Sequence, residues 1–173
     1  MVHPMIDIHT HILPFIDDGA RDLDEAVKML ESFKLQQVYT AICTPHFDPT
    51  KISIEEFVAK REKALLALKG SKITLISGSE TCFHDLLYQY SELDPLCISN
   101  TKYLLLELPY QSQWSKHDFE CIEKLINLFR IIPIIAHIER YNYLWKSKKN
   151  IKELMNLGCV IQINAYTIID KKQ

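Results

Sequence analysis

Near its start the chain carries the stretch Met5-Ile6-Asp7-Ile8-His9-Thr10-His11, an apolar run that ends in two imidazoles separated by one residue. Side chains alternate between the two faces of a β-strand, so His9 and His11 are expected to point the same way. Two imidazoles on one face can bind one metal ion together. A His-x-His pattern also occurs by chance on a solvated strand, so this stretch alone leaves both interpretations open.

Other residues able to bind a metal recur along the chain, and each follows an apolar run: His46, Glu80, Glu107 and His137. In βα barrels the side chains that carry chemistry lie at the carboxyl ends of the strands. Structural histidines and surface acids have no reason to collect at strand ends, so this placement predicts one shared metal site. Asp18, within Asp17-Asp18-Gly19, is a further candidate ligand, although an ordinary turn explains the same residues.

The bulk properties describe a chain of 173 residues, 47% of them hydrophobic, which is the size of one domain with a substantial core. A net charge of −2 and the lack of a basic stripe argue against a nucleic-acid partner. Five scattered cysteines without a Cys-x-x-Cys pair favour a reducing compartment. No apolar run is long enough to cross a bilayer. We therefore expect residues 1–173 to form one soluble, cytoplasmic domain that is not inserted in a membrane.

Apolar, β-branched runs alternate with segments of helical period along the chain. Strands are expected at Met5–Ile8, Val38–Cys43, Ile73–Ser77, Tyr103–Leu108, Ile132–Ala136 and Val160–Asn164. Helices are expected at Leu23–Gln36, Ile54–Lys69, His84–Ser91, Asp118–Arg130 and Ile151–Leu157. The strands are continuously apolar, as in strands covered on both faces, which predicts an α/β fold with a parallel sheet.

Local signals mark several ends of these elements. Asp22 and Ser53 precede acidic residues in the pattern of helix N-caps, and Gly158 stands where a helix C-cap belongs. An apolar stripe on the first helix is expected to pack in the core. It consists of Leu23, Ala26, Val27, Leu30 and Phe33.

The residue types of the candidate site favour metal-dependent phosphoester hydrolysis. Histidine with carboxylate suits Mn²⁺, Fe²⁺ or Zn²⁺, and the lack of cysteine argues against a structural zinc site. Carboxylates such as Glu80 or Glu107 can bridge two ions that activate water and clamp a phosphate. Arg140, three residues after His137, can bind phosphate oxygens, although a surface arginine paired with Glu139 is the alternative. The sequence has neither a thiol-phosphatase loop nor a phosphate-binding Gly-rich loop before Lys-Ser/Thr.

Taken in order, the motifs resemble those of the bacterial metal-dependent tyrosine-protein phosphatases of the PHP superfamily. The matching runs are Ile6–Ile12, Asp17–Gly19, Thr44–His46, Gly78–Glu80, Leu106–Glu107 and Ile135–Tyr141. The resemblance implies a distorted PHP-type (β/α) barrel with a manganese-favouring cluster of up to three ions. It also implies dephosphorylation of a tyrosine kinase that controls capsular or exopolysaccharide synthesis.

The resemblance further implies a role for each candidate residue. His9 and His11 would hold one ion, and Asp18 with His46 would hold another. Glu80 would bridge to an ion bound also by Glu107 and His137. Arg140 would orient the phosphate as a catalytic residue, and no cysteinyl intermediate is required.

Family members continue past the point that corresponds to Gln173 and supply a late Asp-x-His segment with further ligands, which the sequence after Asn164 does not contain. On this resemblance we expect a barrel incomplete at its C-terminus, fewer than three ions, impaired activity and a tendency to self-associate. Two alternatives remain. One is a PHP phosphoesterase that acts on a small phosphate ester such as histidinol phosphate, and the other is an inactive remnant that binds the phosphorylated kinase.

Overall fold

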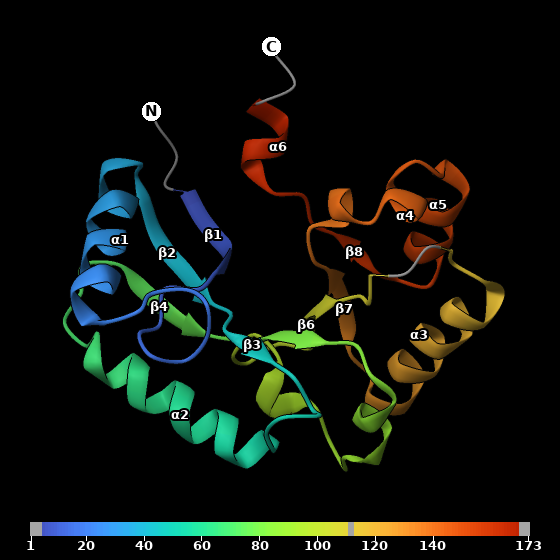
Figure 1. Ribbon diagram of the computed structural model, residues 1–173, viewed down its shortest axis with the longest axis horizontal. Helices are drawn as coiled ribbons and strands as arrows, with labels where there is room; N and C mark the ends of the chain where they lie inside the picture. Colours follow the sequence, from blue (N-terminus) through green and yellow to red (C-terminus); the bar gives the residue numbers. More distant parts are fainter. Residues whose placement is uncertain (1–4, 111–112, 170–173) are drawn as a thin grey trace.

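The computed structural model describes residues 5–110 and 113–169, with strands through the middle of the molecule and helices outside them (Figure 1). The strands are β1 (Met5–Thr10), β2 (Val38–Cys43), β3 (His46–Phe47), β4 (Thr74–Ser77), β5 (Glu80–Cys82), β6 (Tyr103–Glu107), β7 (Ile132–Ile135) and β8 (Val160–Ile161). The helices are α1 (Leu23–Leu35), α2 (Ile54–Ala67), α3 (Lys116–Phe129), α4 (Asn142–Trp145), α5 (Lys148–Asn156) and α6 (Ala165–Ile169). The 3₁₀ turns are η1 (Asp85–Gln89), η2 (Asp94–Leu96) and η3 (Ile138–Arg140). The predicted α/β class is confirmed.

Every strand pairing in the described part of the chain is parallel, in the orders β1-β2-β4 and β3-β5-β6-β7-β8. Two residues separate β2 from β3, and two separate β4 from β5, so each pair is one strand with a break. Cys43 pairs with Ser77 before the breaks, and His46 pairs with Glu80 after them. The two sheets therefore continue into one another, and two predicted ligands begin the second sheet.

The helix starts follow their capping residues. The Asp22 side chain accepts from the backbone N–H of Glu25, and the Ser53 side chain accepts from that of Glu56, which confirms both predicted caps. The third helix begins at Lys116, two residues before the predicted start. Its Asp118 is not the cap but reaches back to accept from the backbone N–H of Ser115 at 2.6 Å.

Two expectations about the helices were wrong. In place of the predicted helix His84–Ser91, the structure has the 3₁₀ turn η1. A run this short gains little from α-helical hydrogen bonds. The His84 ring caps the start of the turn by accepting from the backbone N–H of Leu86. On α1, Leu23 and Val27 are each 42% exposed, so only part of the apolar stripe packs inward. By contrast, Gly158 follows Leu157, the C-cap of α5, and its φ of +92° is the left-handed conformation that ends a helix, as predicted.

The interior is divided between two main clusters of apolar side chains. The larger cluster joins α3, α5 and the strands from β6 onward, and includes Leu104, Leu106, Ile122 and Leu154. The smaller cluster lies where α1 and α2 cover the first strands, and includes Ile12 and Ala26. Among the described residues, no helix is both long and apolar enough to cross a membrane.

One charged side chain ties α2 to the strand that carries Glu80. Arg61 is 4% exposed, and its guanidinium donates to the carbonyl oxygens of Gly78 at 3.0 Å and Pro95 at 2.9 Å. Gly78 lies in the break between β4 and β5, two residues before Glu80. A buried arginine that satisfies two backbone carbonyls therefore fixes the backbone just ahead of the buried carboxylate.

We expect Arg61→Leu to lower the free energy of unfolding by about 2–4 kcal/mol, because two buried carbonyls lose their donor. Urea denaturation followed by circular dichroism measures this change. Arg21→Leu is the matched control, since within residues 5–110 and 113–169 Arg21 forms an ion pair with Glu25 at the surface alone, and its replacement should leave the midpoint nearly unchanged. Equal losses in the two variants would contradict the structural role of Arg61.

Candidate metal centre

All eight candidate residues line one pocket with a volume of about 430 Å³, which we call the ligand pocket. Its lining consists of His9, His11, Asp18, Gly19, His46, Glu80, Glu107, His137, Arg140 and Asn164. The side chains come from β1, the loop after β1, the starts of β3 and β5, the end of β6 and the turn after β7. Segments far apart in the sequence therefore deliver these groups to one place.

The Glu80 carboxylate lies at the middle of this pocket and is 1% exposed. Its Oε2 is 3.1 Å from His9 Nε2, 3.0 Å from His11 Nε2 and 3.4 Å from His46 Nδ1. Its Oε1 is 2.7 Å from His137 Nε2. Burial favours the neutral acid, but hydrogen bonds from His11, His137 and His9 outweigh it and lower the pKa of Glu80. The centre of the pocket is thus an ionised carboxylate ringed by four imidazoles.

The side chains of His9, on β1, and His11, directly after β1, point the same way, as the alternation of strand side chains predicted. Their Nε2 atoms are 3.3 Å apart. The imidazole of His11 is held from its other side by Asp17, whose Oδ2 lies 2.7 Å from His11 Nδ1. Burial lowers the pKa of His11, but hydrogen bonds to Asp17 and Glu80 outweigh it and raise this pKa to about 10.

Asp17 is a residue that sequence reasoning missed, because Asp18 was taken as the ligand of this loop. The Asp17 carboxylate also accepts from the backbone N–H of His46 at 2.9 Å and of Gly19 at 3.0 Å. Burial raises its pKa, but the bonds from His11 and His46 outweigh this and lower it. The Asp17-Asp18-Gly19 run is an Asx turn, which was the available signal that Asp17 organises the loop.

Glycine is required at position 19 by a close approach of two backbone segments. A Cβ built there would lie 2.0 Å from the carbonyl oxygen of His11. That oxygen accepts from the backbone N–H of Ala20 at 3.0 Å, so the loop folds directly against the end of β1. This contact brings Asp17 and Asp18 to the histidines.

The outer side of the pocket is more open. The Asp18 side chain is 81% exposed, and its Oδ1 lies 3.6 Å from His46 Nε2. Glu107, 20% exposed, lies 3.6 Å from His46 Nδ1 and 3.7 Å from His137 Nε2. His46 therefore stands between the exposed and the buried carboxylates.

Three overlapping sets of side chains can each place ligand atoms within 4.8 Å of one another. They are His9–His11–Glu80, His11–Asp18–His46 and His46–Glu80–Glu107. These sets share members, whereas the resemblance had assigned each ion separate histidines. His137 Nδ1 is buried and has no hydrogen-bond partner among the described residues. A partner from outside the protein, such as a metal ion, fits this observation. The donor set of imidazole and carboxylate suits a divalent transition metal.

Arg140 ends the 3₁₀ turn η3 that follows His137 and forms one wall of the ligand pocket. Burial lowers its pKa, but hydrogen bonds to Tyr110 and Tyr166 outweigh it and raise the pKa. The neighbouring Glu139 instead accepts from Asn164 N and Thr167 Oγ1, each at 3.3 Å. The guanidinium is thus held at the pocket by two exposed tyrosines.

The other histidines in the described part of the chain lie outside the ligand pocket. His84 caps η1, and the His117 side chain is 82% exposed, as expected for capping or solvated residues. His3 lies outside the described residues.

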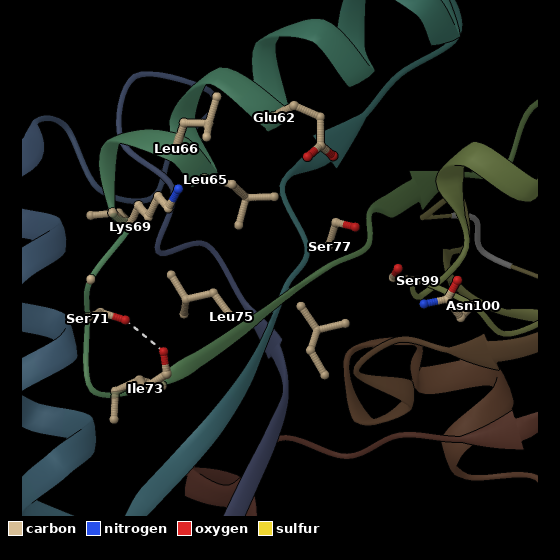
Figure 2. A pocket seen from close by; sticks show the side chains of 13 residues that line it. Glu62, Leu65, Leu66, Lys69, Ser71, Ile73, Leu75, Ser77, Ser99 and Asn100 are labelled. Atoms are coloured by element: carbon tan, nitrogen blue, oxygen red, sulfur yellow. Dashed lines mark hydrogen bonds between the residues drawn. The ribbon is translucent and has the colours of Figure 1, made fainter.

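A second pocket, of about 520 Å³, lies between α2 and β4 (Figure 2). Its lining mixes the apolar side chains of Leu65 and Leu75 with the hydroxyls of Ser77 and Ser99. It contains none of the candidate ligands. Within the described part of the chain, no imidazole lines this second pocket, so its chemistry differs from that of the ligand pocket.

A parallel α/β array that gathers imidazoles and carboxylates in one pocket, at the breaks and ends of its strands, defines the class of PHP-type α/β proteins. The family model "Capsular polysaccharide synthesis, CpsB/CapC" matches residues 5–172. The chain therefore belongs to the CpsB/CapC family.

Similar proteins support the assignment of this chain to the CpsB/CapC family. The tyrosine-protein phosphatase CpsB of Streptococcus agalactiae serotype III is 30% identical over 173 residues, which cover 97% of this chain and 70% of that protein. The tyrosine-protein phosphatase YwqE of Bacillus subtilis is 31% identical over 93% of this chain and 65% of its own length. A solved structure matches with a TM-score of 0.74 and 27% identity, over 92% of this chain and 66% of that one. It comes from work on YwqE and on CpsB of Streptococcus pneumoniae as "unique metal-dependent tyrosine phosphatases".

The raised pKa of His11 makes the stability of the metal-free chain depend on pH. The folded state holds this proton up to a pKa of about 10, against 6.5 in the unfolded chain. The stabilisation is therefore complete below pH 6.5 and is lost as the pH rises toward 10. We expect the free energy of unfolding in EDTA to fall over this range more steeply for the wild type than for His11→Gln, as urea titrations at several pH values would measure. Parallel curves would contradict the charged His11.

Proposed function

We propose that this chain is a metal-dependent protein-tyrosine phosphatase. The observation that carries the proposal is the ionised Glu80 carboxylate among four imidazoles, with Arg140 on the wall of the same pocket. Clustered imidazole and carboxylate ligands beside a guanidinium are what hydrolysis of a phosphate monoester needs. The names of the streptococcal and Bacillus relatives support phosphotyrosine as the ester.

We propose manganese as the metal, held by His9, His11, Asp18, His46, Glu80, Glu107 and His137, within one PHP-type domain formed by residues 1–173. When bound, such ions would supply Lewis-acid stabilisation of the phosphate and a lowered pKa for water. The overlap of the three ligand sets supports more than one ion in the pocket.

The protein's own groups then have distinct tasks. Arg140 binds two phosphate oxygens through its planar guanidinium and stabilises the charge that develops on them. Its hydrogen bonds to Tyr110 and Tyr166 orient it before substrate arrives. The leaving tyrosine oxygen has a phenolic pKa of ~10, so it departs more readily than an alkyl alcohol.

We infer that the substrate is a phosphorylated tyrosine kinase of polysaccharide synthesis, because the matching family is described by capsular polysaccharide synthesis. We further infer a cytoplasmic location, which the five free cysteines support.

The first prediction of this proposal is manganese-dependent release of phosphate from a phosphotyrosine peptide, abolished by EDTA. His137→Ala should lose this activity, because it removes an imidazole 2.7 Å from Glu80. Phosphate release and metal content would be measured on the same samples. Preferential turnover of a small alkyl phosphate would favour a histidinol-phosphatase-like enzyme. Tight binding of a phosphorylated kinase tail without turnover would favour a binding protein.

Arg140→Lys should lower kcat/KM for the phosphotyrosine peptide by about 10–100-fold, because an ammonium cannot replace two parallel hydrogen bonds. The manganese content should remain that of the wild type. Steady-state kinetics and metal analysis test both statements. Arg21→Lys, at the exposed Arg21–Glu25 pair, is the control. Unchanged kinetics in Arg140→Lys would remove Arg140 from the site.

A further inference from the structure

Gln162 follows β8 directly, is 8% exposed and was not among the residues that the sequence singled out. Its side-chain oxygen accepts from the backbone N–H of His137 and lies 3.4 Å from Nδ1 of the His9 ring. Its side-chain nitrogen donates to Oδ1 of Asn164 at 3.0 Å. One buried amide therefore contacts two of the candidate ligands without lining the ligand pocket itself.

These partners fix which way the amide faces. The backbone N–H of His137 is a donor, so the Gln162 atom beside it must be the oxygen. The same oxygen faces His9, so a hydrogen bond there requires the proton on His9 Nδ1. His9 Nε2 is then the atom turned toward Glu80, at 3.1 Å, and toward His11.

The second partner, His137, has an unusual backbone. Its φ of 31° and ψ of 55° place it in the left-handed region, which costs energy for a residue with a side chain. Such a conformation persists where surrounding contacts fix it. Gln162 supplies two of these contacts, because its side chain accepts from His137 N–H and its backbone carbonyl accepts from Ile138 N–H at 3.0 Å.

Gln162 also connects strands of two different sheets. His9 lies on β1, in the sheet β1-β2-β4, whereas His137 and Gln162 follow β7 and β8 of the other sheet. Groups that hold the far side of a ligating histidine set its tautomer and its orientation. A single side chain that holds ligands from both sheets also fixes the distance between them.

We propose that Gln162 is a positioning residue of the metal centre, which sets the tautomer of His9 and the backbone of His137 so that both imidazoles reach one cluster. This inference rests on the metal centre of the proposed function. It assigns Gln162 no contact with substrate.

The test is manganese binding to the purified full chain, measured by calorimetric titration. Gln162→Met keeps the length of the side chain and removes the amide, and it should weaken manganese binding by about 10–100-fold. Gln162→Glu keeps an acceptor for both His137 N–H and His9 Nδ1–H, and it should recover most of the affinity. Binding by Gln162→Met within twofold of wild type, or equal weakening in both variants, would overturn the proposal.

Gln36→Met is the matched control, because it makes the same replacement at an exposed glutamine outside the ligand pocket, whose amide nitrogen donates to Ser32 Oγ at 3.0 Å. It should bind manganese nearly as the wild type does. Circular dichroism of the metal-free proteins separates folding from affinity. A variant that melts early but binds normally once folded would show a structural role alone and would overturn the proposal.

A second measurement on the wild type does not depend on any variant folding. Long-range ¹H–¹⁵N correlation spectra of the chain loaded with diamagnetic Zn²⁺ should show the His9 proton on Nδ1. A proton on Nε2 would overturn the proposal. Neither measurement uses a substrate, so normal metal binding without phosphotyrosine turnover would refute the proposed phosphatase and leave the role of Gln162 standing.

Discussion

The structure depends on a single buried negative charge. Removing a carboxylate from water is costly unless partners surround it, and Glu80 is 1% exposed. Four imidazoles contact it, two from the end of β1 and one each from β3 and the turn after β7, so these three segments must all reach one point. The breaks between β2 and β3 and between β4 and β5 also help to bring these groups together. They place His46 and Glu80 side by side at the start of paired strands.

A second layer of groups makes this arrangement possible. Asp17 holds His11 and the backbone of His46, Arg61 holds the backbone at Gly78, and Gln162 contacts His9 and His137. None of the three is a member of the potential ligand sets. Each is a polar side chain whose hydrogen bonds fix the position of a ligand or of the backbone beside it. Residues that do not belong to the ligand sets therefore largely determine the geometry of the pocket.

The sequence predicted the strands, the caps and the common position of the ligands because each follows from a short-range rule. Alternation along β1 sets the direction of His9 and His11, and Asp22 and Ser53 act within one helical turn. Short-range rules do not reveal Arg61 and Gln162, because their partners lie far away in sequence, as Gln162 does from His9. Asp17 differs, since its partners His11 and Gly19 are close in sequence and its Asx turn was a local signal. The strand expected at Val160–Asn164 ends at Ile161, so Gln162 in fact occupies a strand-end position like those that predicted the ligands.

The ligand pocket collects side chains from His9 to Asn164, and so from almost the whole length of the chain. A centre built from such distant segments has a high contact order, so it cannot form in a local, early step of folding. The charges around Glu80 come together only as both sheets and the loop at Gly19 assemble. An ion bound there would stabilise the folded state of the whole chain, because it would bind the assembled pocket and not its separate parts. Any metal that fills the pocket would therefore support the fold as well as the chemistry.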